Sequence, residues 1–328
     1  GNHLQRARLI SGLVLFVFAL AHFLNHAVGL VSLETMHEMQ LWRTSVTRSL
    51  PGTIVLATAL GVHMVLGLYK FAERKTFKLP PWEMLQLVMG ILIPFLLFPH
   101  IVNTRIASTY FGVQDSYLYE LARLWPSSAI VQSTLLLLVW IHGCIGIHFW
   151  LRLYSPYRAL QPVLLLIVIA IPLAAIAGFA VSGRAIAQLI EQPDRFAQVK
   201  ALTHWPNDAG NDRLAELRGI ARLMFAGLLS AIVAYIAFRY VQRMAAPKIP
   251  VRYIGGPTIQ AVPGASLLEI SRMNRIPHAS VCGGRARCST CRVRIDDTEA
   301  PLPPPGYAEA ITLGSIQAPE NVRLACQV

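Results

Sequence analysis

Six long apolar segments constrain this chain more than any other feature of its sequence. A helix needs about 20 residues to cross the hydrocarbon core of a bilayer. The segments cover residues 8–31, 52–71, 82–104, 128–152, 160–182 and 218–244. Only 14% of all residues are charged, whereas soluble domains carry about 25%. The sequence therefore predicts an all-α bundle of six transmembrane helices over residues 1–246.

Basic residues gather at every second end of these segments. They are Arg6, Arg8, Arg74, Lys75, Lys78, Arg152, Arg158, Arg239, Arg243 and Lys248. Because Lys and Arg are enriched in cytoplasmic loops, we expect both ends of the chain to be cytoplasmic. The net charge of +12 then reflects membrane topology, and we expect no binding to nucleic acid.

Histidines occur inside the apolar segments, where ionisable side chains are costly and usually functional. With a rise of about 1.5 Å per residue, His22 and His100 fall in the outer half of the membrane. By the same measure His63 and His142 fall in the inner half. Each pair comes from two helices at one level, as two axial ligands of a haem require. The simpler alternative is a histidine that hydrogen-bonds a neighbouring helix.

Two further details belong to this histidine pattern. His26 lies one helical turn after His22 on the same face and competes with it as a ligand. Gly67 and Gly146 each follow an inner histidine by four residues, so they lie on the same helix face. Their missing side chains would leave room for a macrocycle, although glycine also serves close helix packing.

The segments around these histidines resemble the di-haem cytochrome b anchors of succinate:quinone oxidoreductases and fumarate reductases. The resemblance rests on HFLNH at His22, VHMVLGLY at His63, FPHIVNTRI at His100 and IHGCIGIHFW at His142. It covers residues 6–155 well and the fifth segment loosely, and the sixth segment has no counterpart. It implies two b haems, one held by His22 and His100 and the other by His63 and His142.

The same resemblance implies a quinone site near a haem. The candidates are His148, Arg152 and Tyr154 at the inner end of the fourth segment. Arg152 and Tyr154 are equally explained as anchors at the membrane interface. Arg105, at the outer end of the third segment, could pair with a haem propionate or simply snorkel to the interface.

Four cysteines near the end of the chain form a second pattern. Cys282, Cys288, Cys291 and Cys326 read C-x5-C-x2-C, then 34 residues, then C. Four thiolates in this kind of spacing hold a [2Fe–2S] cluster, whereas a zinc ribbon is expected to have two C-x2-C pairs. We therefore favour the cluster over zinc. The fifth cysteine, Cys144, lies in an apolar segment, and we expect no disulfides.

The cysteines lie in a C-terminal unit that differs in texture from the bundle. After Pro247 and Pro250 the chain reads as two short strands, a helix and a further strand. SLLEISRMNR, the cysteine loop and RLACQV resemble the [2Fe–2S] ferredoxins, with the five-residue gap of the adrenodoxin-like form. The resemblance implies a β-grasp domain over residues 247–328. Because that family has another strand after the last cysteine, we expect the sequence to stop inside a longer protein.

The order of these parts resembles the membrane and ferredoxin modules of bacterial class III adenylate cyclases that carry a succinate-dehydrogenase-like anchor. In that family a domain that makes cyclic AMP from ATP follows the ferredoxin. The resemblance implies a redox or quinone sensor of that domain, with the bundle in the bacterial inner membrane. It also implies a homodimer, because such a cyclase builds its active site from two chains. No catalytic residue can be assigned in this sequence.

Two other functions fit the same cofactors. One is a quinol-linked subunit that passes electrons between quinone, the haems and a soluble partner. The other is a b-type cytochrome anchor that docks a soluble subunit through the ferredoxin. The haem and cluster motifs do not separate these functions from the sensor, because all of them use the same residues.

Overall fold

The computed structural model describes residues 2–298 and 301–328. Within these residues, six helical segments are long and apolar enough to cross a membrane, which confirms the number expected from the sequence. They are His3–Leu30, Leu50–Ala72, Pro81–Phe111, Ala129–Leu151, Ser155–Ile190 and Asp208–Ala245. The fifth and sixth are longer than their apolar stretches because polar residues continue the helix at the ends.

The helices of the bundle follow one another with short connections. The long ones are α1 (Asn2–Ala27), α3 (Leu50–Ala72), α4 (Pro81–Ile101), α7 (Ala129–Leu151), α8 (Ser155–Ile190) and α10 (Asp208–Ala245). A 3-10 turn, η1 (Val28–Leu30), extends α1, and a π-helical turn, η2 (Val102–Ile106), joins α4 to α5 (Ala107–Phe111). Three shorter helices are α2 (Leu33–Thr47), α6 (Tyr117–Leu124) and α9 (Pro193–Leu202). The sequence analysis did not predict these three.

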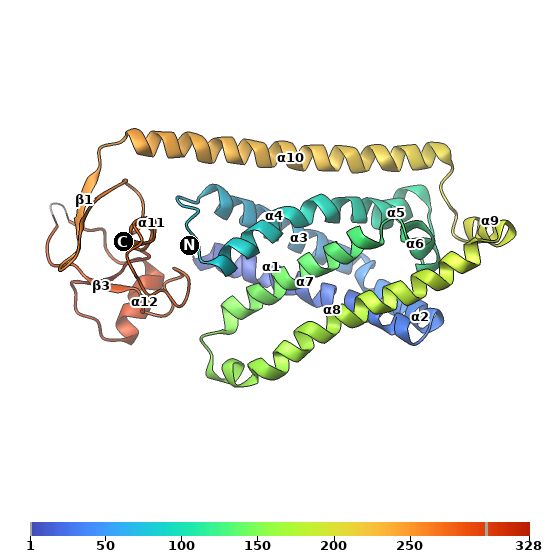
Figure 1. Cartoon of the computed structure of the whole chain (residues 1–328), viewed down its shortest axis with the longest axis horizontal. Helices are drawn as coiled ribbons and strands as arrows, with labels where there is room; N and C mark the ends of the chain where they lie inside the picture. The colour runs from blue at the N-terminus through green and yellow to red at the C-terminus, as the bar shows by residue number, and fades with distance from the viewer. Residues whose placement is uncertain (1, 299–300) are drawn as a thin grey trace.

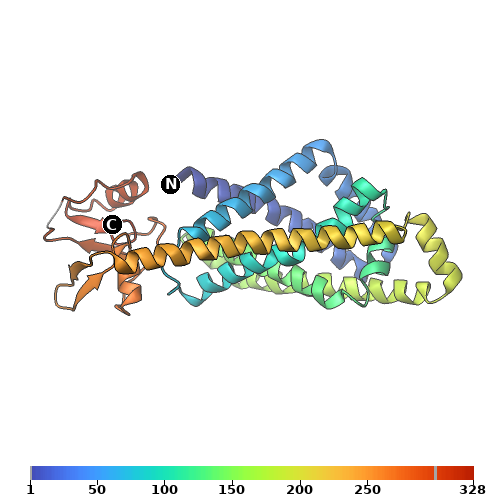
Figure 2. The same ribbon diagram turned by 90° about the horizontal axis from the view of Figure 1, so that it is seen from above.

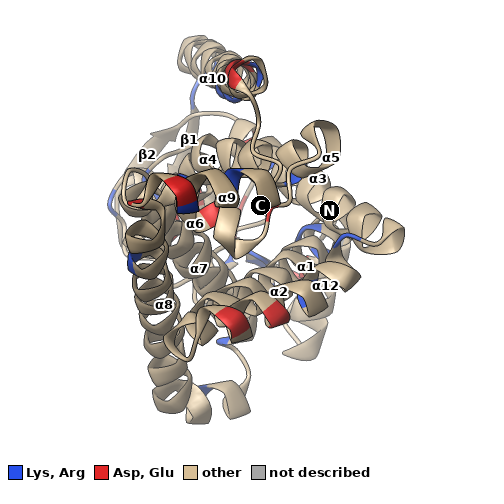
Figure 3. Ribbon diagram, turned by 90° about the vertical axis from the view of Figure 1, so that its right-hand side faces the viewer, with Lys and Arg blue, Asp and Glu red and all other residues tan. Residues whose placement is uncertain are grey.

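The chain passes back and forth along the bundle, so that its N-terminus lies beside the C-terminal unit (Figure 1). We call this end of the bundle the near end and the opposite end the far end. The short helices α2, α6 and α9 gather at the far end, where acidic positions stand out on α2 (Figure 3). The near end carries the basic loop between α3 and α4, whose Lys78 Nζ donates a hydrogen bond to Met273 O at 2.7 Å.

Helices α1, α3, α4, α7 and α8 form the body of the bundle. α1 packs against α3 and α8, and α4 packs against α7. Gly178 of α8 permits the closest of these approaches, because a Cβ there would lie 2.0 Å from the carbonyl oxygen of His26. By contrast, α10 lies along one side, where it packs against α4 and α3 (Figure 1 and Figure 2).

In its described residues, the C-terminal unit has four short strands and two helices. The strands are β1 (Ile249–Arg252), β2 (Thr258–Ala261), β3 (Arg292–Arg294) and β4 (Val322–Leu324), and the helices are α11 (Leu267–Met273) and α12 (Tyr307–Ser315). β1 pairs antiparallel with β2, and β3 pairs antiparallel with β4.

The expected strand order is present, but the expected single sheet is not. In the described residues the strands form two separate two-stranded ladders, whereas a β-grasp fold joins its strands in one sheet. The ladders are short: β3 and β4 have three residues each. Residues 301–306 form neither helix nor strand, and α12, which was not predicted from the sequence, begins at Tyr307 after the N-cap Gly306.

Candidate cofactor sites

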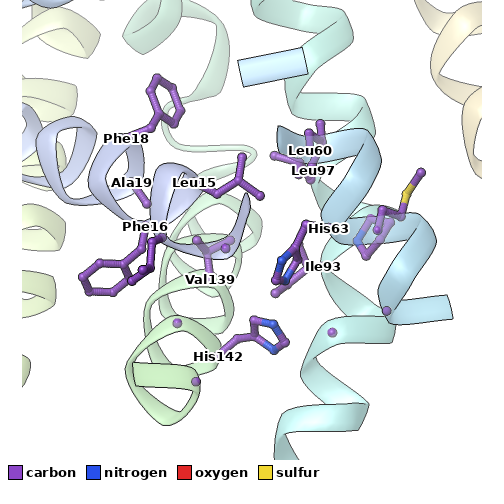
Figure 4. Close-up of a pocket in the computed structure, with 18 of the residues that line it drawn as sticks. Leu15, Phe16, Phe18, Ala19, Leu60, His63, Ile93, Leu97, Val139 and His142 are labelled. Atoms are coloured by element: carbon purple, nitrogen blue, oxygen red, sulfur yellow. The ribbon is translucent and has the colours of Figure 1, made fainter. Parts of the chain in front are cut away.

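His63 of α3 and His142 of α7 face each other inside the bundle. Their ring centroids lie 6.2 Å apart, with the ring planes nearly perpendicular at 88°. Figure 4 shows both rings pointing into a pocket that Leu15, Ile93 and Val139 also line. The structure thus brings together two histidines that lie far apart in the sequence, in apolar surroundings.

Each of these two rings is held by a backbone carbonyl. The Nδ1–H of His63 donates to the carbonyl oxygen of Arg8, and that of His142 to the carbonyl oxygen of Gln86, both at 3.1 Å. A carbonyl can only accept, so Nδ1 carries the hydrogen and Nε2 keeps its lone pair. This is the tautomer in which histidine binds a metal through Nε2, with its other nitrogen fixed by an acceptor.

A second pair lies toward the far end. The ring centroids of His22 of α1 and His100 of α4 are also 6.2 Å apart, with an interplanar angle of 60°. The His100 Nδ1–H donates to Gln132 Oε1 at 3.1 Å. His26 stands 4.7 Å from the His22 ring and 5.4 Å from the ring of Tyr117. Among the described residues, Nδ1 of neither His22 nor His26 has a hydrogen-bond partner.

Both centroid spacings fit two imidazoles that bind one metal ion from opposite sides. With nitrogen–metal bonds of about 2 Å, and about 1 Å from each nitrogen to its ring centre, the two centroids would stand roughly 6 Å apart. The spacing of His22 with His100 and of His63 with His142 is therefore compatible with one metal ion between the two rings of each pair.

One cavity of about 1280 Å³ contacts both histidine pairs. This volume exceeds the roughly 300–1,000 Å³ of an ordinary small-molecule site. Gly67 and Gly146 both line it, and a Cβ at Gly67 would meet no atom within 4 Å. The space beside Gly67 is therefore open, as a bulky flat group next to His63 would require. At the near end the cavity reaches Arg285 and Thr312 of the C-terminal unit.

Two other glycines contact the inner histidines, and the sequence analysis missed them. A Cβ at Gly12 of α1 would lie 2.9 Å from His63 Cε1, and one at Gly90 of α4 would lie 3.1 Å from His142 Cε1. Each ring therefore packs against the bare backbone of a neighbouring helix. No spacing within one helix signals this contact, because the glycine and the histidine belong to different helices.

Positive charge lines the cavity at the far end. Arg105 reaches Thr53 Oγ1 at 3.1 Å, as one of three arginines that line the cavity there. The second, Arg43, is buried and its Nε donates to Asn25 Oδ1 at 3.1 Å. The third, Arg48, forms an ion pair with Asp115. The sequence analysis named Arg105 but not the other two, which come from α2 and its C-cap.

The three residues considered for a quinone do not share one space. Tyr154 is half-exposed and lines the cavity. The His148 ring nitrogen instead lies 3.0 Å from the Tyr157 hydroxyl, and the Arg152 guanidinium stacks on the Phe149 ring at 4.6 Å. Neither His148 nor Arg152 lines the cavity.

The cysteine loop folds tightly around its sulfur atoms. Gly283 and Gly284 have φ angles of +69° and +80°, a region that glycine adopts without strain. The Cys282 N–H points at Cys288 Sγ, and the Arg285 N–H points at Cys282 Sγ, both at 3.3 Å. Backbone amides aimed at sulfur stabilise thiolates and the clusters that they bind.

The four sulfur atoms form two pairs. Cys282 and Cys288 are joined by the amide contact just described, and the Sγ atoms of Cys291 and Cys326 are 3.4 Å apart. A hydrogen bond from Cys291 lowers the pKa of Cys326 to about 6 although burial opposes it, which favours the thiolate. Among the described residues, no group of three or more His, Cys, Asp or Glu side chains is arranged to hold a single metal ion. Two pairs match a cluster with two irons, each bound by two thiolates.

A comparison with known families decides what this loop belongs to. Residues 254–328 match the family model described as 2Fe-2S iron-sulfur cluster binding domain. The C-terminal unit is a [2Fe–2S] ferredoxin domain. The matched residues include all four cysteines of the motif, Cys282, Cys288, Cys291 and Cys326. Neither the curated proteins nor the solved structures gave a match to the chain.

The ferredoxin domain is joined in one chain to six helices that can span a membrane. Its family supports an electron-transfer role at the membrane. The domain contacts the bundle through the α3–α4 loop, where Lys75 and Lys78 donate to the backbone oxygens of Gly264 and Met273.

Proposed function

We propose that this protein is a membrane redox module in which the bundle carries two b haems and exchanges electrons with the [2Fe–2S] cluster of the ferredoxin domain. One observation carries the proposal: a single cavity contacts both histidine pairs and also Arg285, Arg287 and Thr312 of the ferredoxin domain. Three redox groups in such a row would form a path through the membrane.

The proposed axial ligands are His63 with His142 and His22 with His100. The haems would supply one-electron chemistry, and the chain supplies the ligands and the apolar surroundings that set their potentials. The 6.2 Å centroid spacings and the acceptors at three Nδ1 atoms support this assignment. His26 remains the alternative to His22, since within the described part of the chain neither ring has an acceptor for Nδ1. Cys282, Cys288, Cys291 and Cys326 are the proposed cluster ligands.

We further propose that a quinone exchanges electrons with the haems. Of the three residues considered for its site, Tyr154 has support because it lines the cavity. In the sensor form of the proposal, the cluster reports the quinone pool to an adenylate cyclase domain that follows the ferredoxin, in a homodimer. That form rests on the resemblance stated above.

The second candidate is a quinol-linked electron-transfer subunit with a soluble partner. One observation favours it: Val281, directly before the ligand Cys282, is 50% exposed. A partner protein could therefore approach the cluster loop from the side that the bundle leaves open. In both forms we propose that the near end faces the cytoplasm, because the basic residues at the ends of the apolar segments border it. The bacterial inner membrane, as the location of the bundle, rests on the resemblance.

The test is a cofactor inventory of the full chain. Purified protein should contain two b haems, with two iron and two sulfide for the cluster, and quinol should reduce haem and cluster together. Changing His63→Ala or His142→Ala should remove one haem while leaving the cluster absorption. A single haem that survives both changes would contradict the pairing, and zinc without iron would contradict the cluster.

A further inference from the structure

Phe149 lies where the bundle meets the ferredoxin domain. It follows His142 by seven residues on α7, which places it about 10 Å farther toward the near end. Its ring is 6% exposed, and two guanidinium groups stack on it. Arg152 of the same helix end lies 4.6 Å from the ring centroid, and Arg285 of the cysteine loop lies 4.9 Å from it. Both distances are within the range of cation–π attraction.

Arg285 belongs to the cysteine loop and also contacts the bundle. Its backbone N–H points at Cys282 Sγ at 3.3 Å, and its Nη1 donates to the Cys282 carbonyl at 3.4 Å. Its guanidinium then covers Phe149. One side chain therefore links a cluster ligand to the helix that carries His142.

An acidic residue of the bundle holds the same loop from the other side. Glu83, in the first turn of α4, packs so closely on Gly283 that a Cβ there would lie 2.6 Å from Glu83 Oε1. Burial lowers the pKa of Arg285, and the Glu83 carboxylate opposes that effect.

We propose that Arg285, Phe149 and Glu83 form a clamp that seats the cluster loop on the near end of the bundle and fixes the cluster against the inner histidine pair. Arg285 is a positioning residue in this clamp: it touches no iron, but it orients the loop that does. The inference deepens the proposed function, because the clamp matters for electron exchange only if that exchange occurs. The seating of the loop on the bundle is independent of electron exchange, because it follows from the contacts of Arg285 with Phe149 and of Glu83 with Gly283.

The experiment compares variants of the full chain in lipid nanodiscs by hydrogen–deuterium exchange. In Arg285→Ala, peptides that cover residues 283–287 and 146–152 should exchange about fivefold faster, since the cation–π contact is lost. The visible absorption of the cluster should remain. Arg292→Ala is the matched control: Arg292 is an exposed arginine of the same domain, and its loss should change neither peptide.

A second variant, Phe149→Leu, and the rate of electron transfer between haem and cluster test the clamp further. Should Arg285→Ala lose its cluster, Phe149→Leu removes the ring from the bundle side without altering the loop, and the same two peptides should loosen. The clamp would be overturned if the two peptides exchanged hydrogen no faster in Phe149→Leu than in the Arg292→Ala control. The same result in Arg285→Ala with its cluster intact would also overturn it. Rapid mixing then follows electron exchange between haem and cluster. If no electrons pass between haem and cluster in the wild-type protein, the proposed function is contradicted. If electrons pass at the wild-type rate in a variant whose peptides exchange hydrogen faster, only the role of the clamp is contradicted.

Discussion

Glu309 of α12 and Arg323 of β4 form a bidentate ion pair that is almost closed to solvent. Both contacts are 2.9 Å, and the side chains are 1% and 7% exposed. Glu309 also accepts the backbone N–H of Leu324 at 2.8 Å, and Arg323 donates to the carbonyl of Pro303 at 2.8 Å. With these bonds, the pair fixes the strand that leads to Cys326.

Replacing Glu309 by Ala should destabilise the ferredoxin domain strongly. The change would leave the Arg323 guanidinium buried without its partner, which typically costs about 3–5 kcal/mol. Urea unfolding of the full chain, followed by the loss of cluster absorption, should show a lower midpoint. Asp296→Ala is the control, because it removes only the exposed pair with Arg294, and the midpoint should not move.

The same pair predicts a pH dependence. Burial alone would raise the pKa of Glu309, but the hydrogen bonds from Arg323 and Leu324 outweigh it, and the pKa is lowered. A carboxyl with a lowered folded pKa contributes stability above its unfolded pKa of about 4.3 and loses it as the pH falls further. The stability advantage of wild type over Glu309→Gln should therefore be constant from pH 7 to 6 and shrink near pH 4. An advantage that does not change on acidification would contradict this origin.

Filling the open space beside the inner histidines should exclude the inner haem. Gly67→Leu places a side chain in the cavity, where a Cβ meets no atom, so the helix can fold but the macrocycle cannot fit. Gly61→Leu on the same helix is matched, because Gly61 also has open space but does not line the cavity. Haem content should fall from two to one in the first variant only. Equal haem content in both would mean that this space is not a haem site.

The hydrogen bond of His100 predicts a selective effect on the outer haem. Gln132→Leu removes the acceptor of its Nδ1–H, and loss of such a partner typically weakens metal binding about 10- to 100-fold. Redox titration and haem content should change for the outer haem and not for the inner one. Thr134→Val should have no effect, because the Thr134 hydroxyl donates to the Ile130 carbonyl of its own helix.

Thr290 should tune the cluster. Its hydroxyl accepts the Val281 N–H at 3.0 Å, so its own hydrogen is free for Cys288 Sγ, also at 3.0 Å. A hydrogen bond to sulfur stabilises the reduced, more negative cluster. Thr290→Val should lower the midpoint potential by about 40 mV, the equivalent of a bond of about 1 kcal/mol. Ser280→Ala, in the same loop, should leave the potential unchanged in an EPR-monitored titration.

The sequence was sufficient for features that depend on local pattern. Hydropathy located the six long helices, and the fixed helical rise assigned the histidines to two levels. The short helices were missed because none has a span-length apolar run. α2, for example, is defined by its Ser32 cap, whose side chain accepts the Thr35 N–H.

Contacts between distant segments could not be predicted in the same way. Gly12 of α1 contacts His63 of α3. Glu309 of α12 pairs with Arg323 because the chain turns back after α12 and brings β4 beside it. The guanidinium of Arg285 lies on the ring of Phe149, which belongs to a helix more than a hundred residues earlier in the chain. Each of these depends on which elements become neighbours, and spacing along the chain does not encode that.

Helix α10 has a mechanical consequence. It runs unbroken for 38 residues from Asp208 to Ala245, about 57 Å at the helical rise, and only residues 246–248 separate it from β1. Its side contacts include Phe225 against Phe95 and Arg239 with Glu73. At this length, a rigid tilt of roughly 5° about the far end of α10 would displace its near end by roughly 5 Å. The side contacts of α10 with α4 and α3 therefore also hold the position of the ferredoxin domain, which follows this helix after three residues.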